Sequence, residues 1–153
     1  MTSDDKQIIS RLSHEDGAHL DLFFNQFGFG QFATGWSQSA LSQDAYLGLS
    51  IRSQNGDIAA AIICRILADE AEIIEIAVAD TYRRRHYAGD LLLALQEELS
   101  CQNVTRVVLE VAEINEPARL LYQKYGFIAC GHRASYYDNH IGAIIMELWL
   151  SKV

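Results

Sequence analysis

Apolar residues recur with the spacing of a helix in two segments of the chain. In residues 14–27 these positions are Leu20, Phe23, Phe24 and Phe27. In the second segment they are Tyr87, Leu91, Leu92, Leu95 and Leu99. Acidic residues occupy the other face of the second segment. Each pattern predicts an amphipathic helix packed against a core.

Two further helices are predicted from capping residues. Asn115 followed by Pro117 is typical of a helix start, and Gly126 is typical of the position just beyond a helix end. A short helix is expected to begin at a cap formed by Ser37. The preceding residues 28–35 contain three glycines, which predict a mobile loop.

Seven shorter apolar segments predict strands. They are residues 6–12, 45–52, 58–67, 71–79, 105–112, 127–132 and 143–150. Asn55-Gly56, between the second and third segments, is a strong signal for a hairpin. The resulting order is β-α-α-β-β-β-α-β-α-β-β, and its strand–helix–strand units imply parallel pairs. We therefore expect an α/β (α+β) fold with a mixed central sheet and helices on both faces.

The composition predicts one globular domain over residues 1–153. Half of the residues are apolar and one is proline. The longest apolar run, residues 58–64, is too short to cross a membrane, and the first seven residues lack the profile of a secretory signal. These features predict a cytoplasmic protein. The net charge of −8 argues against nucleic acid as a partner and would attract a basic peptide.

No metal site is predicted. The five histidines have neither zinc-ligand spacing nor an H-E-x-x-H pattern. The cysteines Cys64, Cys101 and Cys130 lie in apolar or helical segments, and we expect them to be reduced, buried thiols.

An arginine-rich turn precedes the helix that starts near Tyr87. It contains Arg83, Arg84 and Arg85, and the free N–H groups of a helix start favour phosphate binding. Neither a G-x-G-x-x-G pattern nor a Walker A loop is present, so a dinucleotide or P-loop site has no support. The pattern alone leaves open a phosphate site or a solvated basic turn.

A second segment with candidate chemistry contains Glu110 and Tyr122. Glu110 interrupts an apolar strand near its C-terminal end, where ligand clefts form in open parallel sheets. Tyr122 lies about two turns into the following helix. The residues alone leave two interpretations open: both side chains are catalytic, or Glu110 caps a strand end and Tyr122 fills the core.

Together these segments resemble the GNAT superfamily of acetyltransferases and, within it, the bacterial ribosomal-protein-alanine N-acetyltransferases of the RimI type. The likeness extends over essentially the whole chain. It rests on Asp69-Glu70-Ala71-Glu72, Ile76-Ala77-Val78, Tyr82-Arg83-Arg84, Leu109-Glu110-Val111, Asn115, Leu121-Tyr122, Tyr125-Gly126-Phe127, Arg133, Tyr136-Tyr137 and Ala143-Ile144-Ile145-Met146.

The resemblance implies a GNAT-like sheet of about six or seven strands and acetyl-CoA as the cofactor, held where two neighbouring strands diverge. A strand would bind the pantetheine arm through its backbone, a turn would surround the pyrophosphate, and a residue after the next strand would contact the cofactor. In this sequence these residues are Ile76, Ala77 and Val78 in the strand, Arg83, Arg84, Arg85, His86, Tyr87, Ala88 and Gly89 in the turn, and Asn115. Glu110 resembles the family's proton acceptor and Tyr122 its proton donor. His86 stands where the family has its first glycine, and histidine can adopt left-handed backbone only at a cost that glycine avoids.

The implied reaction suits these residue types. The acceptor amine must be neutral to attack a thioester, and at pH 7 about a tenth of an α-amine is neutral, against a few parts in ten thousand of a lysine side chain. A carboxylate such as Glu110 can remove the proton of the amine if it is buried. A backbone N–H near Val78 can bind the oxyanion, and the phenol of Tyr122 can protonate the departing thiolate.

The sequence therefore predicts an N-acetyltransferase that acts on the N-terminal α-amine of a protein, with a basic ribosomal protein as the implied acceptor. Three alternatives stay open. The chain could be a relative that modifies a small amine or another protein terminus. Because of His86 it could be a non-catalytic acyl-CoA-binding module, and the arginine turn alone could serve an interaction protein.

Overall fold

The computed structural model describes residues 7–135 and 140–151. In chain order its elements are β1 (Ile9–Arg11), η1 (His14–Asp16), α1 (Gly17–Phe27), α2 (Trp36–Leu41), β2 (Tyr46–Arg52), β3 (Ile58–Leu67), β4 (Glu70–Val78), η2 (Asp80–Tyr82), α3 (Tyr87–Cys101), β5 (Arg106–Ala112), α4 (Glu116–Lys124), β6 (Ile128–Arg133) and β7 (Ala143–Trp149). The strands form one mixed sheet in the order β1-β2-β3-β4-β5-β7-β6. The predicted α/β fold and element order are confirmed, with two short 3-10 turns added.

The chain forms two compact units. The first contains residues 1–63 and 75–91, and the second contains residues 64–74 and 92–153. Strands β3 and β4 and helix α3 therefore contribute residues to both units.

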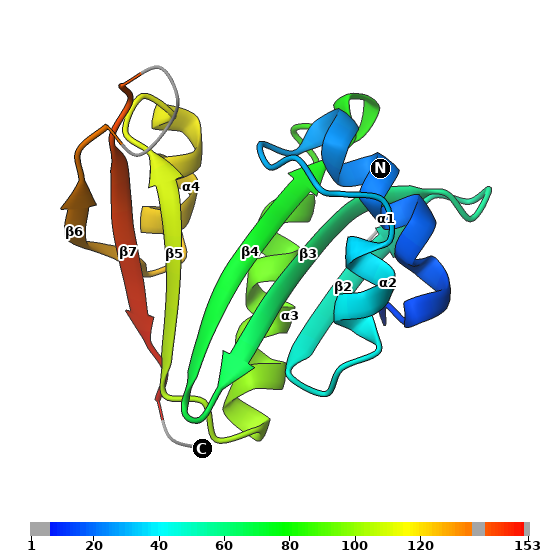
Figure 1. The fold of residues 1–153 in the computed structure, drawn as a ribbon, viewed down its shortest axis with the longest axis horizontal. Coiled ribbons are helices and arrows are strands. Elements are labelled where there is room, and N and C mark those ends of the chain that lie inside the picture. The colour runs from blue at the N-terminus through cyan, green and yellow to red at the C-terminus, as the bar shows by residue number, and fades with distance from the viewer. Residues whose placement is uncertain (1–6, 136–139, 152–153) are drawn as a thin grey trace, which may run out of the picture. The chain divides into compact units, whose positions relative to one another are not determined.

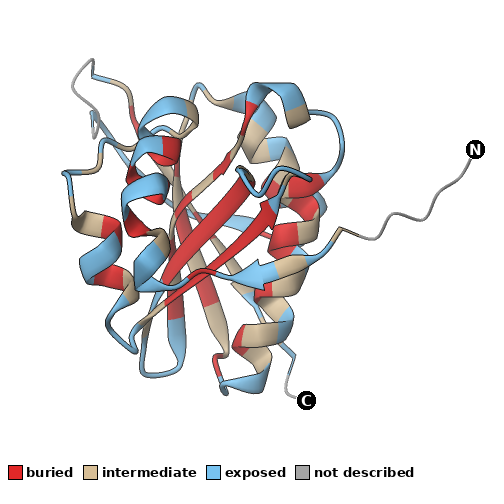
Figure 2. Ribbon diagram, turned by 90° about the vertical axis from the view of Figure 1, so that its right-hand side faces the viewer, coloured by how far each residue is buried: buried red, intermediate tan, exposed pale blue. Residues whose placement is uncertain are grey.

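In the first unit, α1 and α2 lie over β2 and β3 (Figure 1). Strand β1 pairs antiparallel with β2. The predicted hairpin turn is present, because Gly56 has a φ of 86° and donates its N–H to Ser53 at 2.9 Å. Figure 2 shows buried residues along the strands and on parts of the helices. The interior includes Leu20, Phe24 and Ile62, none of which has exposed surface.

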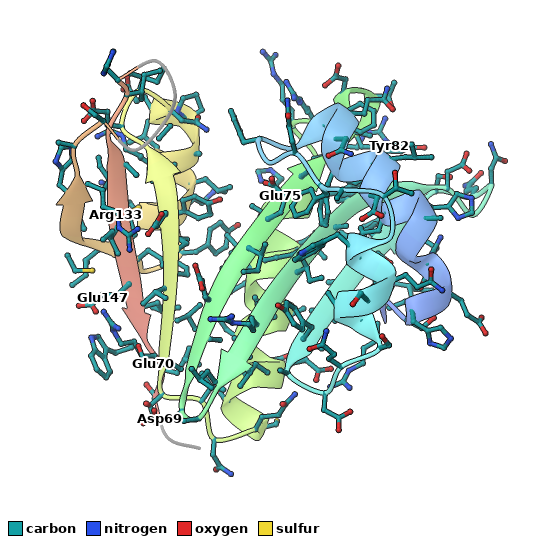
Figure 3. All side chains as sticks on the ribbon, viewed as in Figure 1. Asp69, Glu70, Glu75, Tyr82, Arg133 and Glu147 are labelled. Carbon is teal, nitrogen blue, oxygen red and sulfur yellow. The ribbon has the colours of Figure 1, made fainter. Side chains whose placement is uncertain are left out.

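In the second unit, β5 lies between β4 and β7 and pairs with both strands. Residues 70–72 of β4 pair in parallel with residues 106–108, and all of β5 pairs antiparallel with β7. Arg106 joins these strands: its guanidinium contacts Glu70 and lies 2.6 Å from Glu147. The same guanidinium lies 5.6 Å from the ring centre of Trp149. Glu70 and Glu147 are labelled in Figure 3.

Three local predictions are revised or limited by the structure. The N-cap of α2 is Gly35, with a φ of 89°, whereas Ser37 lies inside the helix and is buried. All three cysteines are free, but the prediction that they are buried holds for Cys64 and is wrong for Cys101 and Cys130, which are exposed. Tyr136 and Tyr137 lie outside the described residues. Within the described ranges, no helix has the length and apolar character needed to cross a bilayer.

The apolar face of α3 gives a test of the core. Leu95 is 1 % exposed and Leu93 is 51 % exposed on the same helix. We expect Leu95→Ala to lower the free energy of unfolding by about 2–5 kcal/mol, because it removes buried methyl groups and leaves a cavity. The control Leu93→Ala should change it by less than about 0.5 kcal/mol. Urea titration monitored by circular dichroism measures both, and equal losses would contradict this assignment of the helix face.

Candidate functional site

The turn between β4 and α3 has a defined shape. Beyond β4, the N–H of Ala79 donates to the carbonyl of Ala59 at 2.9 Å, and η2 follows. The rings of Tyr82 and Tyr87 are stacked, with centres 5.9 Å apart and planes at 20°. Because Tyr87 is buried and begins α3, this stack ties the turn to the start of the helix.

Two residues of this turn have left-handed backbone. The φ angles are 64° at Arg84 and 62° at His86. His86 thus adopts the backbone that the family's glycine would adopt more easily, and nothing in the sequence pointed to Arg84. Each left-handed non-glycine residue costs about 1–2 kcal/mol, and such conformations concentrate where a chain holds a ligand.

The arginine side chains of the turn remain at the surface. Arg83 lies 3.1 Å from Asp80, and both side chains are exposed. The guanidinium of Arg85 lies 5.2 Å from the ring centre of Tyr82. The turn therefore presents cationic groups whose positions are partly fixed by its own residues, as an anionic ligand requires.

A hollow lies beside this turn, with a volume of about 920 Å³. Its lining includes Arg52 and Asn55 from the β2–β3 hairpin, and Tyr82 and Arg85 from the turn. Ile76, Ala77 and Val78 are not part of that lining. The three strand residues predicted to bind pantetheine therefore lie outside this hollow.

Glu75 is a buried carboxylate that the sequence analysis did not single out. Alternate residues of β4 point inward, and Glu75 occupies one of these positions with 8 % of its surface exposed. Its Oε2 accepts N–H groups from Phe29 at 3.1 Å and Gly30 at 2.7 Å, and its Oε1 accepts that of Ile76 at 3.1 Å. Burial raises the pKa of Glu75, although the three backbone donors act in the opposite direction. The sequence did contain a signal for this residue: Glu75 is an acidic residue at a position of β4 that the alternating pattern places on the inward face.

The loop after α1, which the glycines predict to be mobile, makes hydrogen bonds at several points. The carboxylate of Asp21 accepts the N–H groups of Gly35 and Ser37, each at 2.9 Å. Asn25 exchanges two hydrogen bonds with the backbone of Phe32, at 2.9 and 2.6 Å. These contacts and those of Glu75 fix both ends of the loop.

Glu110 lies in the second unit, on β5. Its neighbours Leu109 and Val111 are buried, so the side chain of Glu110 projects from the opposite face of the strand. Its Oε1 is 3.2 Å from Nε of Arg133, and the side chain is 22 % exposed. Arg133 is labelled in Figure 3. The carboxylate of Glu110 is thus only partly shielded from water, and the cationic side chain of Arg133 lies beside it.

Tyr122 is held in α4 of the same unit. Asn115 caps this helix through a 3.3 Å hydrogen bond from the N–H of Ala118 to its Oδ1, as predicted. Tyr122 is buried, and its ring meets that of Phe127 edge to face at 5.8 Å. Gly126 has a φ of 97° and ends the helix, which confirms its predicted position. Asn115 therefore has a structural role whether or not it contacts a cofactor.

A second acidic group, Glu113, follows β5. Its Oε2 is 2.8 Å from Nε2 of His132, and its Oε1 accepts the N–H of Gly142 at 3.1 Å. The hydrogen bond with His132, followed by that with Gly142, lowers the pKa of Glu113. Glu113 therefore fastens the end of β5 to β6 and to the residue before β7.

The predicted site residues fall into two groups. Those of β4 and the arginine turn, residues 76–78 and 83–89, belong to the first unit. Glu110, Asn115 and Tyr122 belong to the second unit. Among the described residues, no three His, Cys, Asp or Glu side chains are grouped as metal ligands would be.

Comparisons with known proteins agree on one family. Residues 17–127 match the family model described as the acetyltransferase (GNAT) family. The [ribosomal protein bS18]-alanine N-acetyltransferase of Haemophilus ducreyi is 37 % identical over 75 % of this chain and 83 % of its own length. That of Escherichia coli K12 is 35 % identical over 76 % and 82 %.

Solved structures agree with this result. The crystal structure of the ribosomal-protein-S18-alanine N-acetyltransferase from Escherichia coli has a TM-score of 0.84 and 30 % identity, covering 96 % of both chains. Arabidopsis thaliana NAA60 in complex with acetyl-CoA has a TM-score of 0.83 at 15 % identity, covering 93 % of this chain and 97 % of its own. At that identity the second match concerns the fold alone.

The Glu113 contacts predict a pH dependence of stability. The native pKa of Glu113 lies below its ordinary value of 4.5. Above pH 4.5 the carboxylate contributes its full stabilisation. As the pH falls below that value, the unfolded chain binds the proton first and the contribution is lost.

Glu113→Gln should therefore be less stable than the wild type near neutral pH, and its stability should fall less steeply in acid. Urea unfolding between about pH 3 and pH 7 tests this, with Glu97→Gln on the exposed face of α3 as the control. Parallel curves for Glu113→Gln and wild type would contradict the assignment.

Proposed function

Because the chain belongs to the GNAT acetyltransferase family, we propose that it transfers the acetyl group of acetyl-CoA to the N-terminal α-amine of ribosomal protein bS18, at an alanine. The chain is an N-acetyltransferase, and the proposal adds the identity of its acceptor. The observation that carries the proposal is the 37 % identity with a bS18-alanine N-acetyltransferase over 75 % of the chain. The match to the enzyme from Escherichia coli over 96 % of both chains supports it. A ribosomal acceptor would place the reaction in the cytoplasm.

We assign the cofactor to the first group of site residues. Acetyl-CoA supplies an activated acetyl group as a thioester. The backbone of Ile76, Ala77 and Val78 is assigned to the pantetheine arm, and residues 83–89 to the pyrophosphate. Support comes from the two left-handed residues of the turn and from its surface arginines. Asn115 is assigned a contact with the cofactor in addition to its capping role.

We assign the proton transfers to the second group. Glu110 accepts a proton from the acceptor amine, directly or through a water molecule, as the nitrogen bonds to the carbonyl carbon. A backbone N–H near Val78 stabilises the negative charge on the carbonyl oxygen. As the carbon–sulfur bond breaks, the phenol of Tyr122 gives its proton to the sulfur. Arg133 holds the Glu110 carboxylate in position from 3.2 Å.

An α-amine fits this arrangement better than a lysine. About a tenth of an α-amine is neutral at pH 7, so Glu110 has to remove a proton only during attack. The net charge of −8 favours encounter with a basic acceptor.

The proposal is tested with acetyl-CoA and a panel of acceptors. The panel contains a peptide with the N-terminal sequence of bS18, the same peptide with a blocked N-terminus and an internal lysine, and a set of small amines. Mass spectrometry should detect one acetyl group, on the α-amine of the first peptide only. Acetylation of small amines alone would contradict the ribosomal acceptor, and binding of acetyl-CoA without turnover of any acceptor would contradict an enzymatic role.

Tyr122→Phe tests the proton donor. It should lower kcat by about 10²–10⁴-fold, because a general acid contributes that much to a transfer step. The affinity for acetyl-CoA, measured by calorimetry, should stay nearly the same, because the ring and its packing on Phe127 are retained. Tyr125→Phe, at the C-cap of the same helix, is the matched control and should keep its activity. Unchanged turnover in Tyr122→Phe would remove this residue from the mechanism.

A further inference from the structure

The hollow beside the arginine turn has no part in the reaction proposed above. Its volume of about 920 Å³ is within the range of sites that bind small molecules. Its lining comes from β1 and the residues before it, from the β2–β3 hairpin, and from the turn after β4. All of these residues belong to the first unit. The fold thus brings three segments that are far apart in the chain around one concave surface.

The lining is cationic, whereas the chain as a whole is acidic. The chain has 20 acidic side chains against 12 lysines and arginines. Within the described part of the chain, the hollow is lined by two arginines, Arg52 and Arg85, and by no aspartate or glutamate. Most of the other lining residues carry hydroxyl or amide groups, which donate hydrogen bonds. The hollow therefore offers both positive charge and donors to an anion.

Both guanidinium groups are held by their neighbours. Arg52 donates to the carbonyl oxygen of Gly56 at 3.0 Å and lies 2.7 Å from the carboxylate of Asp16. A guanidinium has five N–H donors, so Arg52 retains donors for a ligand, although Asp16 offsets its charge. The guanidinium of Arg85 lies 5.2 Å from the ring centre of Tyr82. Because these cations are already positioned, little conformational entropy is lost when an anion binds.

Ser53 adds a hydroxyl group that has no partner within the protein. It lines the hollow, and its Oγ is buried without a hydrogen bond among the described residues. Its backbone is fixed, because its N–H donates to Asp57 at 2.8 Å and its carbonyl oxygen accepts the N–H of Gly56 at 2.9 Å. Since no hydrogen bond holds the side chain in its rotamer, the hydroxyl is free to turn to a ligand oxygen. Such a contact would remove the cost of the unpaired group.

The hollow is separate from the place assigned to the pantetheine arm. That arm is assigned to residues 76–78 of β4, and none of these lines the hollow. In the sheet, β4 lies between β3 and β5, whereas the hollow is lined from β1 and from the hairpin that joins β2 to β3. A ligand in the hollow therefore reaches the arginine turn from the side of β2 and β3.

The groups of the lining favour an organic phosphate. The planar guanidinium binds a phosphate group through parallel N–H bonds. The stacked rings of Tyr82 and Tyr87 both contribute to the wall, and the amides of Gln54 and Asn55 can donate and accept hydrogen bonds. Groups of these kinds suit the hydroxyls and ring nitrogens of a sugar or a nucleoside.

We propose that this hollow binds a phosphate monoester of sugar or nucleotide size as a second ligand, together with acetyl-CoA. The phosphate group lies against Arg85 and Arg52, and the hairpin amides contact the rest of the ligand. This inference goes beyond the proposed function and does not depend on the identity of the acceptor.

The test is a calorimetric titration of the full chain in saturating acetyl-CoA, which occupies the cofactor's own nucleotide site. The probes are AMP and ribose 5-phosphate, with adenosine and inorganic phosphate as controls. AMP and ribose 5-phosphate should each bind one-to-one, and more weakly as salt is added. Adenosine lacks the phosphate group and inorganic phosphate lacks the organic part, so each should bind at least about tenfold more weakly than AMP.

Variants locate the site. Arg52→Gln should weaken AMP binding by about tenfold or more, because it removes a charged donor. Ser53→Ala should weaken it by about two- to tenfold, yet leave the free chain at least as stable in urea, because its hydroxyl has no partner to lose. Arg65→Gln is the matched control, since Arg65 is an exposed arginine of β3 that does not line the hollow. Its Kd for AMP should equal that of the wild type.

Each contrary outcome is distinct. Absence of AMP and ribose 5-phosphate binding in saturating acetyl-CoA would overturn the inference, and so would equal binding of adenosine or of inorganic phosphate. An unchanged Kd in both Arg52→Gln and Ser53→Ala would place the ligand elsewhere and overturn it as well. A chain that binds AMP as described but acetylates no peptide would contradict the proposed function alone.

Discussion

The parallel pairing of β4 with β5 is the constraint on which the rest of the molecule depends. Strands that run in the same direction need a crossover, and here the crossover is the arginine turn followed by α3. Arg106 secures this pair at its start by joining Glu70 of β4 to Glu147 of β7 through β5. Loss of the guanidinium would leave both carboxylates without this partner. The topology therefore places the turn and a helix start directly after the end of β4, where α/β sheets bind ligands.

In the proposed mechanism the chemistry divides into cofactor binding and proton transfer. The turn contributes left-handed backbone at Arg84 and His86, and this strained geometry is supported by the stacked rings of Tyr82 and Tyr87. The second unit contributes Glu110, beside a cation, and Tyr122, packed in a capped helix. Glu75 adds a third element, because it determines the position of a loop that no part of the proton-transfer scheme requires.

The sequence predicted most of the elements because their signals are local. Residues 58–67 were assigned as a strand with the bounds that the structure has, and the cap at Asn115 and the stop at Gly126 were found from residue type alone. Contacts between distant residues were not predictable in this way. The Glu75 hydrogen bonds join residues 45 and 46 positions apart, and the Arg133–Glu110 pair exists only once β5, β6 and β7 are aligned. The cap at Gly35 was missed because serine is the commoner signal.

The central claim is that this chain binds the thioester cofactor through its nucleotide phosphates at the arginine turn. Calorimetric titration with acetyl-CoA, and with acetyl-pantetheine, which lacks those phosphates, tests it most directly. We expect one-to-one binding of acetyl-CoA that weakens as salt is added, and much weaker binding of acetyl-pantetheine. Equal affinity for the two compounds, or no binding of acetyl-CoA by the folded chain at low salt, would contradict it.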